Sequence, residues 1–182
     1  MSTLLNIIEQ VRSRLDSDGR TTDEAALDFA VEAALPSALR ALAVKVAAQP
    51  REIATYLEKT VAPTIASTSA DLTSFLSISE PILVKAPFTQ VTHASVSLPF
   101  VFVPDVTRLQ WESSPDLAFY TVDGNIIKFV PPTGVTVSGA LTVTASFIPQ
   151  LSSVRQVLEP LLIDEIMPLI NIPQQDKKPK GR

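Results

Sequence analysis

Two apolar runs joined by Asp123-Gly124 are the feature that most constrains the fold of this 182-residue chain. The runs extend from Leu117 to Val130, and an Asp-Gly pair between apolar runs is the strongest short-range indication of a β-hairpin. Around this hairpin, residues 95–148 have the pattern of a compact β-meander, and helical sequence flanks them on both sides. We therefore predict a β-module held between helices.

Prolines recur at short intervals from Pro81 to Pro132, a spacing that excludes long helices and favours short strands separated by turns. In the last predicted strand, hydroxyl side chains alternate with apolar ones, so one face is expected to be buried. The predicted strands are Ile82–Lys85, Ser95–Leu98, Thr107–Glu112, Leu117–Val122, Asn125–Val130 and Ala140–Ile148.

A first amphipathic helix is predicted to begin near Ser2 or Thr3 and to end at residues 16–19. Its apolar stripe follows a helical spacing through Leu4, Ile8, Val11 and Leu15. Thr21 and Glu24 then have the spacing of a capping box, which predicts the start of a second helix. The apolar face of this second helix contains Leu27, Val31, Leu35, Leu39, Leu42 and Val46.

Proline at position 36 removes one hydrogen bond of the second helix, so we predict either a kinked helix or two collinear helices. A third, shorter helix is predicted from Pro50 through Ile53, Leu57 and Val61, and residues 64–79 fit either a helical turn or the entry of a strand. After Pro149, a serine cap and a shared apolar face predict a closing helix with Leu158, Leu162, Ile166 and Ile170.

These elements predict an α+β fold in which an N-terminal helical bundle is combined with an antiparallel β-sandwich or open barrel and a short C-terminal helix. The predicted divisions are a helical segment at 1–63, a connector at 64–79, a β-module at 80–150, a closing helix packed on the domain at 151–173 and a flexible basic tail at 174–182.

The composition excludes several functional classes. The absence of cysteine removes disulfides, thiolate nucleophiles and sulfur-ligated zinc. A formal net charge of −4 argues against binding to duplex DNA, which requires clustered Lys and Arg. The N-terminal residues lack a basic region and reach a charge at Glu9, so we expect neither a signal peptide nor a membrane anchor. Because only 19% of the residues are charged, the surface is suited to burial in an assembly.

The residues that could support catalysis or metal binding all have a simpler structural interpretation. We expect His93, the only histidine, to be a solvated loop residue. We expect no metal, no cofactor and no catalytic residue. We expect turn and cap roles for Asp16, Asp18, Asp23 and Glu24, a solvated helix face for Glu159, Asp164 and Glu165, and core packing for Trp111, Phe119, Tyr120 and Phe129.

The C-terminal tail carries the only cationic cluster. Its polar composition favours either a solvated terminus or an arm that folds onto a groove of a partner. The residues of this candidate partner-binding arm are Gln174, Gln175, Asp176, Lys177, Lys178, Lys180 and Arg182.

Taken in order, these elements resemble the head-to-tail connector, or adaptor, proteins of tailed bacteriophages. The resemblance rests on residue patterns in four places: Arg14-Leu15-Asp16 followed by Thr-Thr-Asp-Glu at 21–24; Val96-Ser97-Leu98-Pro99 leading through Phe102 and Val103 into Val106-Thr107-Arg108-Leu109; the hairpin Tyr120–Ile127 followed by Pro131-Pro132; and the strand Leu141–Phe147 that ends at Pro149. Residues 64–90 resemble an insertion, and the closing helix is shorter than in the family.

The resemblance implies a structural virion protein without enzymatic activity. It implies a homo-oligomeric ring, with twelve copies as the expected number, that lies in the neck between the portal of the capsid and a tail or nozzle protein. Such a ring lines the channel through which the genome passes, and a weakly acidic lumen would let DNA slide. By the same analogy, the arm at 174–182 is a candidate portal-docking element. The protein would be made in the host cytoplasm and would not contact a membrane.

Three alternatives remain open at this point. Another tail or tail-completion component could use the same β-module. A glycan-binding module, from a different functional class, would need Trp111 or Tyr120 exposed on a concave face. A hydrolase would require His93 beside a buried carboxylate and a serine in a pocket.

Overall fold

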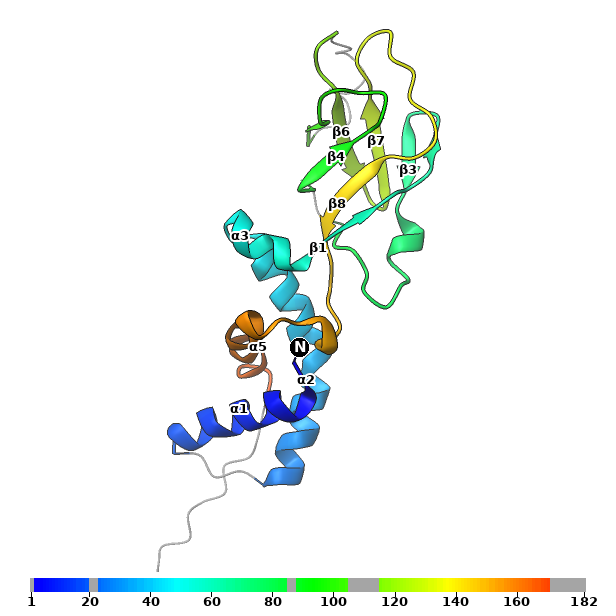
Figure 1. Ribbon diagram of the computed structural model, residues 1–182. Helices are drawn as coiled ribbons and strands as arrows, with labels where there is room; N and C mark the ends of the chain where they lie inside the picture. Colours follow the sequence, from blue (N-terminus) through cyan, green and yellow to red (C-terminus); the bar gives the residue numbers. More distant parts are fainter. Residues whose placement is uncertain (1, 20–22, 85–87, 105–114, 171–182) are drawn as a thin grey trace, which may run out of the picture. The chain divides into compact units, whose positions relative to one another are not determined.

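The computed structural model describes residues 2–19, 23–84, 88–104 and 115–170. The chain divides into two compact units, which Figure 1 shows as a group of helices and a group of strands. The helical unit contains Met1–Lys45 and Pro149–Arg182, and the β unit contains Val46–Ile148. The predicted α+β class is confirmed, but the β unit is an insertion between two segments that together form the helical unit.

The first predicted helix is confirmed as α1 (Leu4–Ser17). It begins where predicted because the Thr3 side chain accepts a hydrogen bond from the backbone N–H of Asn6 at 3.3 Å. It ends where predicted because Asp18 is the C-cap and Gly19 adopts a φ of +74°, a conformation that glycine reaches without strain. The buried face of α1 contains Ile7, Ile8, Val11 and Leu15.

The second helix, α2 (Glu24–Ala47), continues through Pro36 without a break. At its start, the carboxylate of Asp23 accepts a hydrogen bond from the backbone N–H of Ala25 at 3.0 Å and so caps the helix. Thr21, the predicted capping residue, lies outside the described residues. The helical unit is completed by the 3-10 turns η3 (Leu151–Ser153) and η4 (Gln156–Leu158) and by α5 (Glu159–Ile166). The closing helix thus belongs with α1 and α2.

The β unit opens with α3 (Arg51–Ala54) and η1 (Thr55–Leu57), carries the short turn η2 (Thr73–Phe75) and forms two open sheets. One sheet has the order β1 (Glu58–Val61), β8 (Thr142–Ser146) and β4 (Gln90–Thr92). The other has the order β2 (Ile65–Ala66), β3 (Ser69–Asp71), β7 (Ile126–Val130), β6 (Phe119–Asp123) and β5 (Val101–Phe102). All strand pairs are antiparallel except β5 with β6, so the second sheet is mixed rather than purely antiparallel as predicted.

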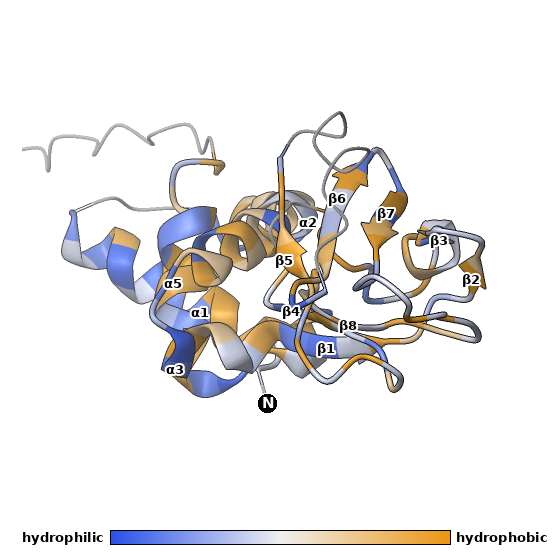
Figure 2. Cartoon of the chain, turned by 90° about the horizontal axis from the view of Figure 1, so that it is seen from above, coloured by the Kyte–Doolittle hydropathy of each residue, from blue (hydrophilic) through white to orange (hydrophobic). Residues whose placement is uncertain are grey.

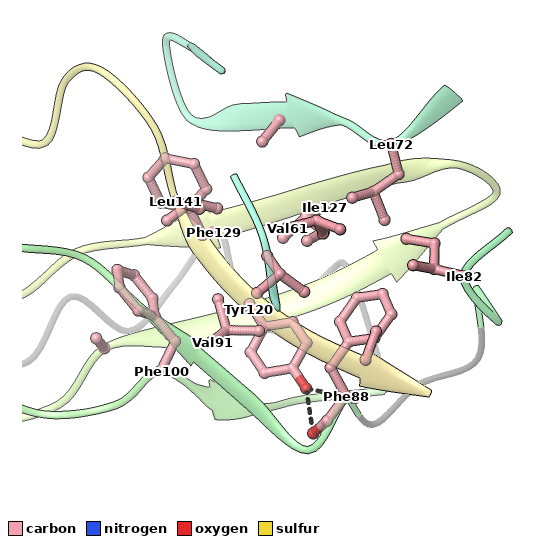
Figure 3. Close-up of a cluster of buried hydrophobic side chains, with 14 of the residues drawn as sticks. Val61, Leu72, Ile82, Phe88, Val91, Phe100, Tyr120, Ile127, Phe129 and Leu141 are labelled. Carbon is pink, nitrogen blue, oxygen red and sulfur yellow. Dashed lines mark hydrogen bonds between the residues drawn. The ribbon is translucent and has the colours of Figure 1, made fainter. Parts of the chain in front are cut away.

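One hydrophobic core joins the two sheets, as expected for a sandwich. Val61 and Val91 come from the three-stranded sheet, whereas Tyr120, Ile127 and Phe129 come from the five-stranded sheet (Figure 3). The predicted buried face of β8 is confirmed, because Leu141, Val143, Ala145 and Phe147 are all buried. The predicted sandwich therefore describes the β unit correctly, and its sheets remain open.

The hairpin at Asp123-Gly124 is confirmed as β6 and β7. Asp123 pairs with Ile126 in the register, which leaves Gly124 and Asn125 as the two turn residues. Gly124 has a φ of +58°, as the tight turn requires. The hairpin supplies β7, the central strand of the five-stranded sheet, and its neighbour β6, so a locally encoded turn positions the middle of this sheet.

The third predicted helix is wrong beyond Leu57. Residues 58–61 form β1, which pairs with β8 from Glu58 opposite Ser146 to Val61 opposite Val143. The apolar spacing through Leu57 and Val61 fits a continuous helix, but it also fits a helical turn followed by a strand. Pairing with β8 favours the strand for residues 58–61. The unassigned connector at 64–79 contains β2 and β3, which belong to the five-stranded sheet.

Other strand predictions were displaced along the chain. Residues 95–98 form no strand, and the strands on either side of them are β4 and β5. Within residues 82–85, Ile82 makes only an isolated bridge to Phe147, and Lys85 lies outside the described residues. The predicted strand at 107–112 also lies outside the described residues.

Candidate functional site

A polar cluster joins α5 to α1 inside the helical unit, and its centre is Glu159. This side chain is only 6% exposed. Its carboxylate accepts hydrogen bonds from Asn6 Nδ2, at 3.2 Å and 3.1 Å, and from Gln10 Nε2 at 2.8 Å. Asn6 and Gln10 lie one helical turn apart on α1, so both amides reach the same carboxylate. The cluster holds the start of α5 against α1.

The Ser2 hydroxyl lies between two acceptors, the Glu159 carboxylate and the carbonyl oxygen of Val154 at 3.0 Å. Hydrogen bonding from Ser2 contributes most to lowering the pKa of Glu159 below its usual value, and Gln10 and Asn6 lower the pKa further. Burial acts in the opposite direction but does not overcome these hydrogen bonds. The carboxylate is therefore held in its charged form as an acceptor.

Two ion pairs extend this cluster along α5. Arg14 Nη1 lies 2.5 Å from Asp164 Oδ1, and Lys45 Nζ lies 2.8 Å from Glu165 Oε1. The hydrogen bond to Glu165 raises the pKa of Lys45. The prediction of a solvated acidic face is wrong for Glu159, which is buried, and incomplete for the other two acids, which pair with the neighbouring helices. Sequence spacing alone could not reveal this, because the partners are more than a hundred residues away.

Replacing Glu159 with glutamine should destabilise the helical unit at neutral pH by roughly 1–3 kcal/mol, because the new amide would face the amide donors of Asn6 and Gln10. The lowered pKa means that the stability supplied by ionised Glu159 is present above its unfolded value of 4.5 and is lost as the pH falls through the folded value. Urea unfolding of both proteins at several pH values should show a difference that narrows below pH 4.5. Glu32→Gln, at an exposed position on α2, is the control, and a Glu159→Gln difference independent of pH would contradict this account.

His93 is buried, so the prediction of a solvated loop histidine is wrong. Its Nδ1 accepts the backbone N–H of Ser95 at 3.1 Å, which leaves Nε2 to donate to the carbonyl oxygen of Ser138 at 2.9 Å. Both ring nitrogens are thus bonded to backbone groups. This arrangement links the turn after β4 to the loop before β8, and it differs from the carboxylate and serine neighbours that a hydrolase would need.

Tyr120 and Phe129 confirm the predicted core packing of aromatic residues. The Tyr120 ring stacks on Phe88 with 6.1 Å between the ring centroids. Its hydroxyl accepts the N–H of Phe88 at 2.8 Å and lies 3.4 Å from the Phe88 carbonyl oxygen (Figure 3). Burial raises the pKa of Tyr120 to about 12. Tyr120 is therefore not the exposed platform that glycan binding would need; Phe119 is half-buried, and Trp111 lies outside the described residues.

The acidic residues around the first interhelical turn have the predicted structural roles. Asp18 is the C-cap of α1, and Asp23 caps α2. Among the described residues, no group of three or more His, Asp or Glu side chains could hold a metal ion. The candidate arm, Gln174, Gln175, Asp176, Lys177, Lys178, Lys180 and Arg182, lies outside the described residues.

Exposed apolar side chains are the feature that sequence analysis missed. Phe29 on α2 is 75% exposed and Leu5 on α1 is 67% exposed. In the β unit, the edge strand β5, apolar along its length in Figure 2, contains Val101, which is 47% exposed. The available signal was the absence of Phe29 and Leu5 from the predicted apolar stripes. Large apolar residues outside the core-facing stripe are candidates for contact with other proteins.

No known protein-family model matches the chain, and a search of curated proteins also finds no match. Among the helices in the described ranges, none has both the length and the apolarity required to cross a membrane.

Proposed function

We propose that the chain is a structural subunit of a phage head-to-tail connector, a closed ring between the portal and the tail. The observation that carries this proposal is the exposure of large apolar side chains, above all Phe29 and Leu5 on the helical unit. A surface of this kind is stabilised by burial against other protein subunits. The sequence resemblance to connectors is the reason for proposing that this assembly is a ring between the portal and the tail.

The buried polar groups also fit a structural role. Glu159 is bonded to amides of α1, His93 to backbone groups and Tyr120 to Phe88. These hydrogen bonds connect segments that are distant in sequence. Glu159, His93 and Tyr120 are residue types that often act in catalysis, but here their polar atoms bond to structural groups. The low fraction of charged residues and the net charge of −4 suit broad subunit contacts and a channel that does not retain DNA phosphates.

The mass of the purified protein tests the proposal. A connector ring should have about twelve times the 19.6 kDa chain mass in native mass spectrometry, alone or bound to a portal ring, with a central channel in electron micrographs. A chain that remains monomeric in solution and in the presence of portal rings would contradict the proposal. Binding of the monomer to immobilised sugars would instead favour a glycan-binding module.

A further inference from the structure

The helix α2 has two different faces within the helical unit. One face is buried and includes Leu27, Val31 and Leu42. The opposite face, which we call the α2 outer face, consists of exposed residues spaced four, three and four apart, namely Phe29, Ala33, Pro36 and Arg40. Three of these four residues are apolar, so α2 is largely apolar on this exposed side. A helix with apolar residues on both sides is typically covered on both sides.

The helix α1 also has an exposed face, which we call the α1 outer face. It consists of the exposed residues Leu5, Glu9 and Asp16 and the partly buried Arg12, with the same spacing of four, three and four. Leu5 is 67% exposed, and Glu9 and Asp16 are exposed acids. Arg12 inclines toward its own α2, with a guanidinium nitrogen 3.6 Å from Glu24. The α1 outer face therefore has an apolar residue at one end and an acid at the other.

The two outer faces match when two helices lie side by side in the same direction. The first and last residues of each face are eleven positions apart, or about 16 Å at the rise of an α-helix. In this direction Leu5 lies against Phe29, and Asp16 lies against Arg40. In the opposite direction, Leu5 would meet the Arg40 charge and Asp16 would meet Phe29. Charge complementarity thus selects the parallel arrangement.

We infer that the α2 outer face binds the α1 outer face of a second copy of this chain. The inference rests on the proposed function and specifies its lateral contact. Because the two faces differ, each copy can use α2 toward one neighbour and α1 toward the other. A heterologous contact of this kind generates a ring when the rotation between neighbours closes.

Removing the apolar anchor is the first test. Phe29→Ser should weaken assembly on the order of tenfold or more, because buried aromatic anchors dominate interface energies. Sedimentation velocity over a range of concentrations should show a shift from the ring toward the monomer. Circular dichroism should remain unchanged, since the Phe29 side chain is 75% exposed in the single chain.

Reversing the charges is the second test and identifies the partner surface. Asp16→Arg and Arg40→Asp should each weaken assembly, and the double variant should recover it because the pair is restored with opposite sign. Arg51→Asp, at an exposed position of the β unit, is the control and should have no effect.

The outcomes separate this inference from the proposed function. A wild-type ring that tolerates Phe29→Ser and both charge reversals would overturn the inference and leave the connector proposal standing. A wild-type chain that never assembles would overturn both. A closed dimer sensitive to the same changes would support the contact between the two faces and contradict the ring.

Discussion

Replacing Ile127 with alanine should destabilise the β unit by about 2–5 kcal/mol, one of the largest single effects that we expect in this chain. Ile127 is fully buried in β7, at the centre of the core that joins the two sheets. Truncation removes three carbon atoms from a core to which both sheets contribute, and the cavity left behind adds to the cost of the lost burial. Stability can be measured by urea unfolding, and amide hydrogen exchange should show reduced protection in β6, β7 and β8.

The adjacent residue provides the control for this prediction. Ile126 is 40% exposed and points away from the core, because successive side chains of a strand alternate between faces. Ile126→Ala makes the same chemical change and should cost much less, within about 1 kcal/mol. Equal losses at the two positions would contradict the assigned register, in which Ile127 pairs with Val122 and Ile126 pairs with Asp123.

Replacing Leu162 with alanine should destabilise the helical unit by a similar amount, about 2–5 kcal/mol. Leu162 is fully buried in α5, three residues after Glu159. The β unit separates α5 from α1 along the chain, so the packing of α5 against α1 joins the two segments of the helical unit. Hydrogen exchange should therefore show lost protection in both α1 and α5, although the two helices are separated by more than a hundred residues.

Leu169 is the matched control for Leu162, because it undergoes the same truncation at a site that is 48% exposed. Leu169→Ala should leave the protection of α1 unchanged. If Leu162→Ala reduced protection only in α5 itself, α1 would not depend on the closing helix, and the assignment of both helices to one unit would be wrong.

The elements that were predicted correctly are those whose signals lie within a few residues. The start of α1 near Thr3, its end within residues 16–19 and the hairpin at Gly124 all depend on backbone geometry that local side chains impose. The alternation in β8 was equally clear, because one face of that strand is buried throughout. These predictions were correct because tertiary packing favours the same backbone conformation as the local sequence.

The elements that were predicted wrongly depend on distant partners. β1 was predicted as helix because four residues cannot show a strand pattern, and its conformation is set by β8, more than eighty residues later. Strands as short as β2 and β5, of two residues each, have no sequence pattern of their own. Their backbone groups become strand only when a paired neighbour supplies the hydrogen bonds.

The difference between local signals and distant partners also explains which candidate functional residues could be predicted from the sequence. Sequence periodicity identified the buried stripes of α1 and α2, and the residues outside those stripes include Leu5 and Phe29. It did not place Glu159 or His93, because their burial depends on Asn6 and Gln10 in one case and on Ser138 in the other. A sequence does not show which distant groups will form hydrogen bonds with a polar residue, so its burial can be recognised only in the tertiary structure.

Short-range geometry and the periodicity of apolar residues are sufficient to predict the α+β class, the first helix and the central hairpin from the sequence alone. The tertiary structure alone shows that the two helical segments on either side of the predicted β-module form a single unit. The chain enters the sheets through β1 and leaves through β8, and these strands are neighbours, with the Phe147 N–H donating to the Leu57 carbonyl oxygen at 2.9 Å. This pairing brings together points ninety residues apart, and its stabilisation comes from contacts that no local segment contains.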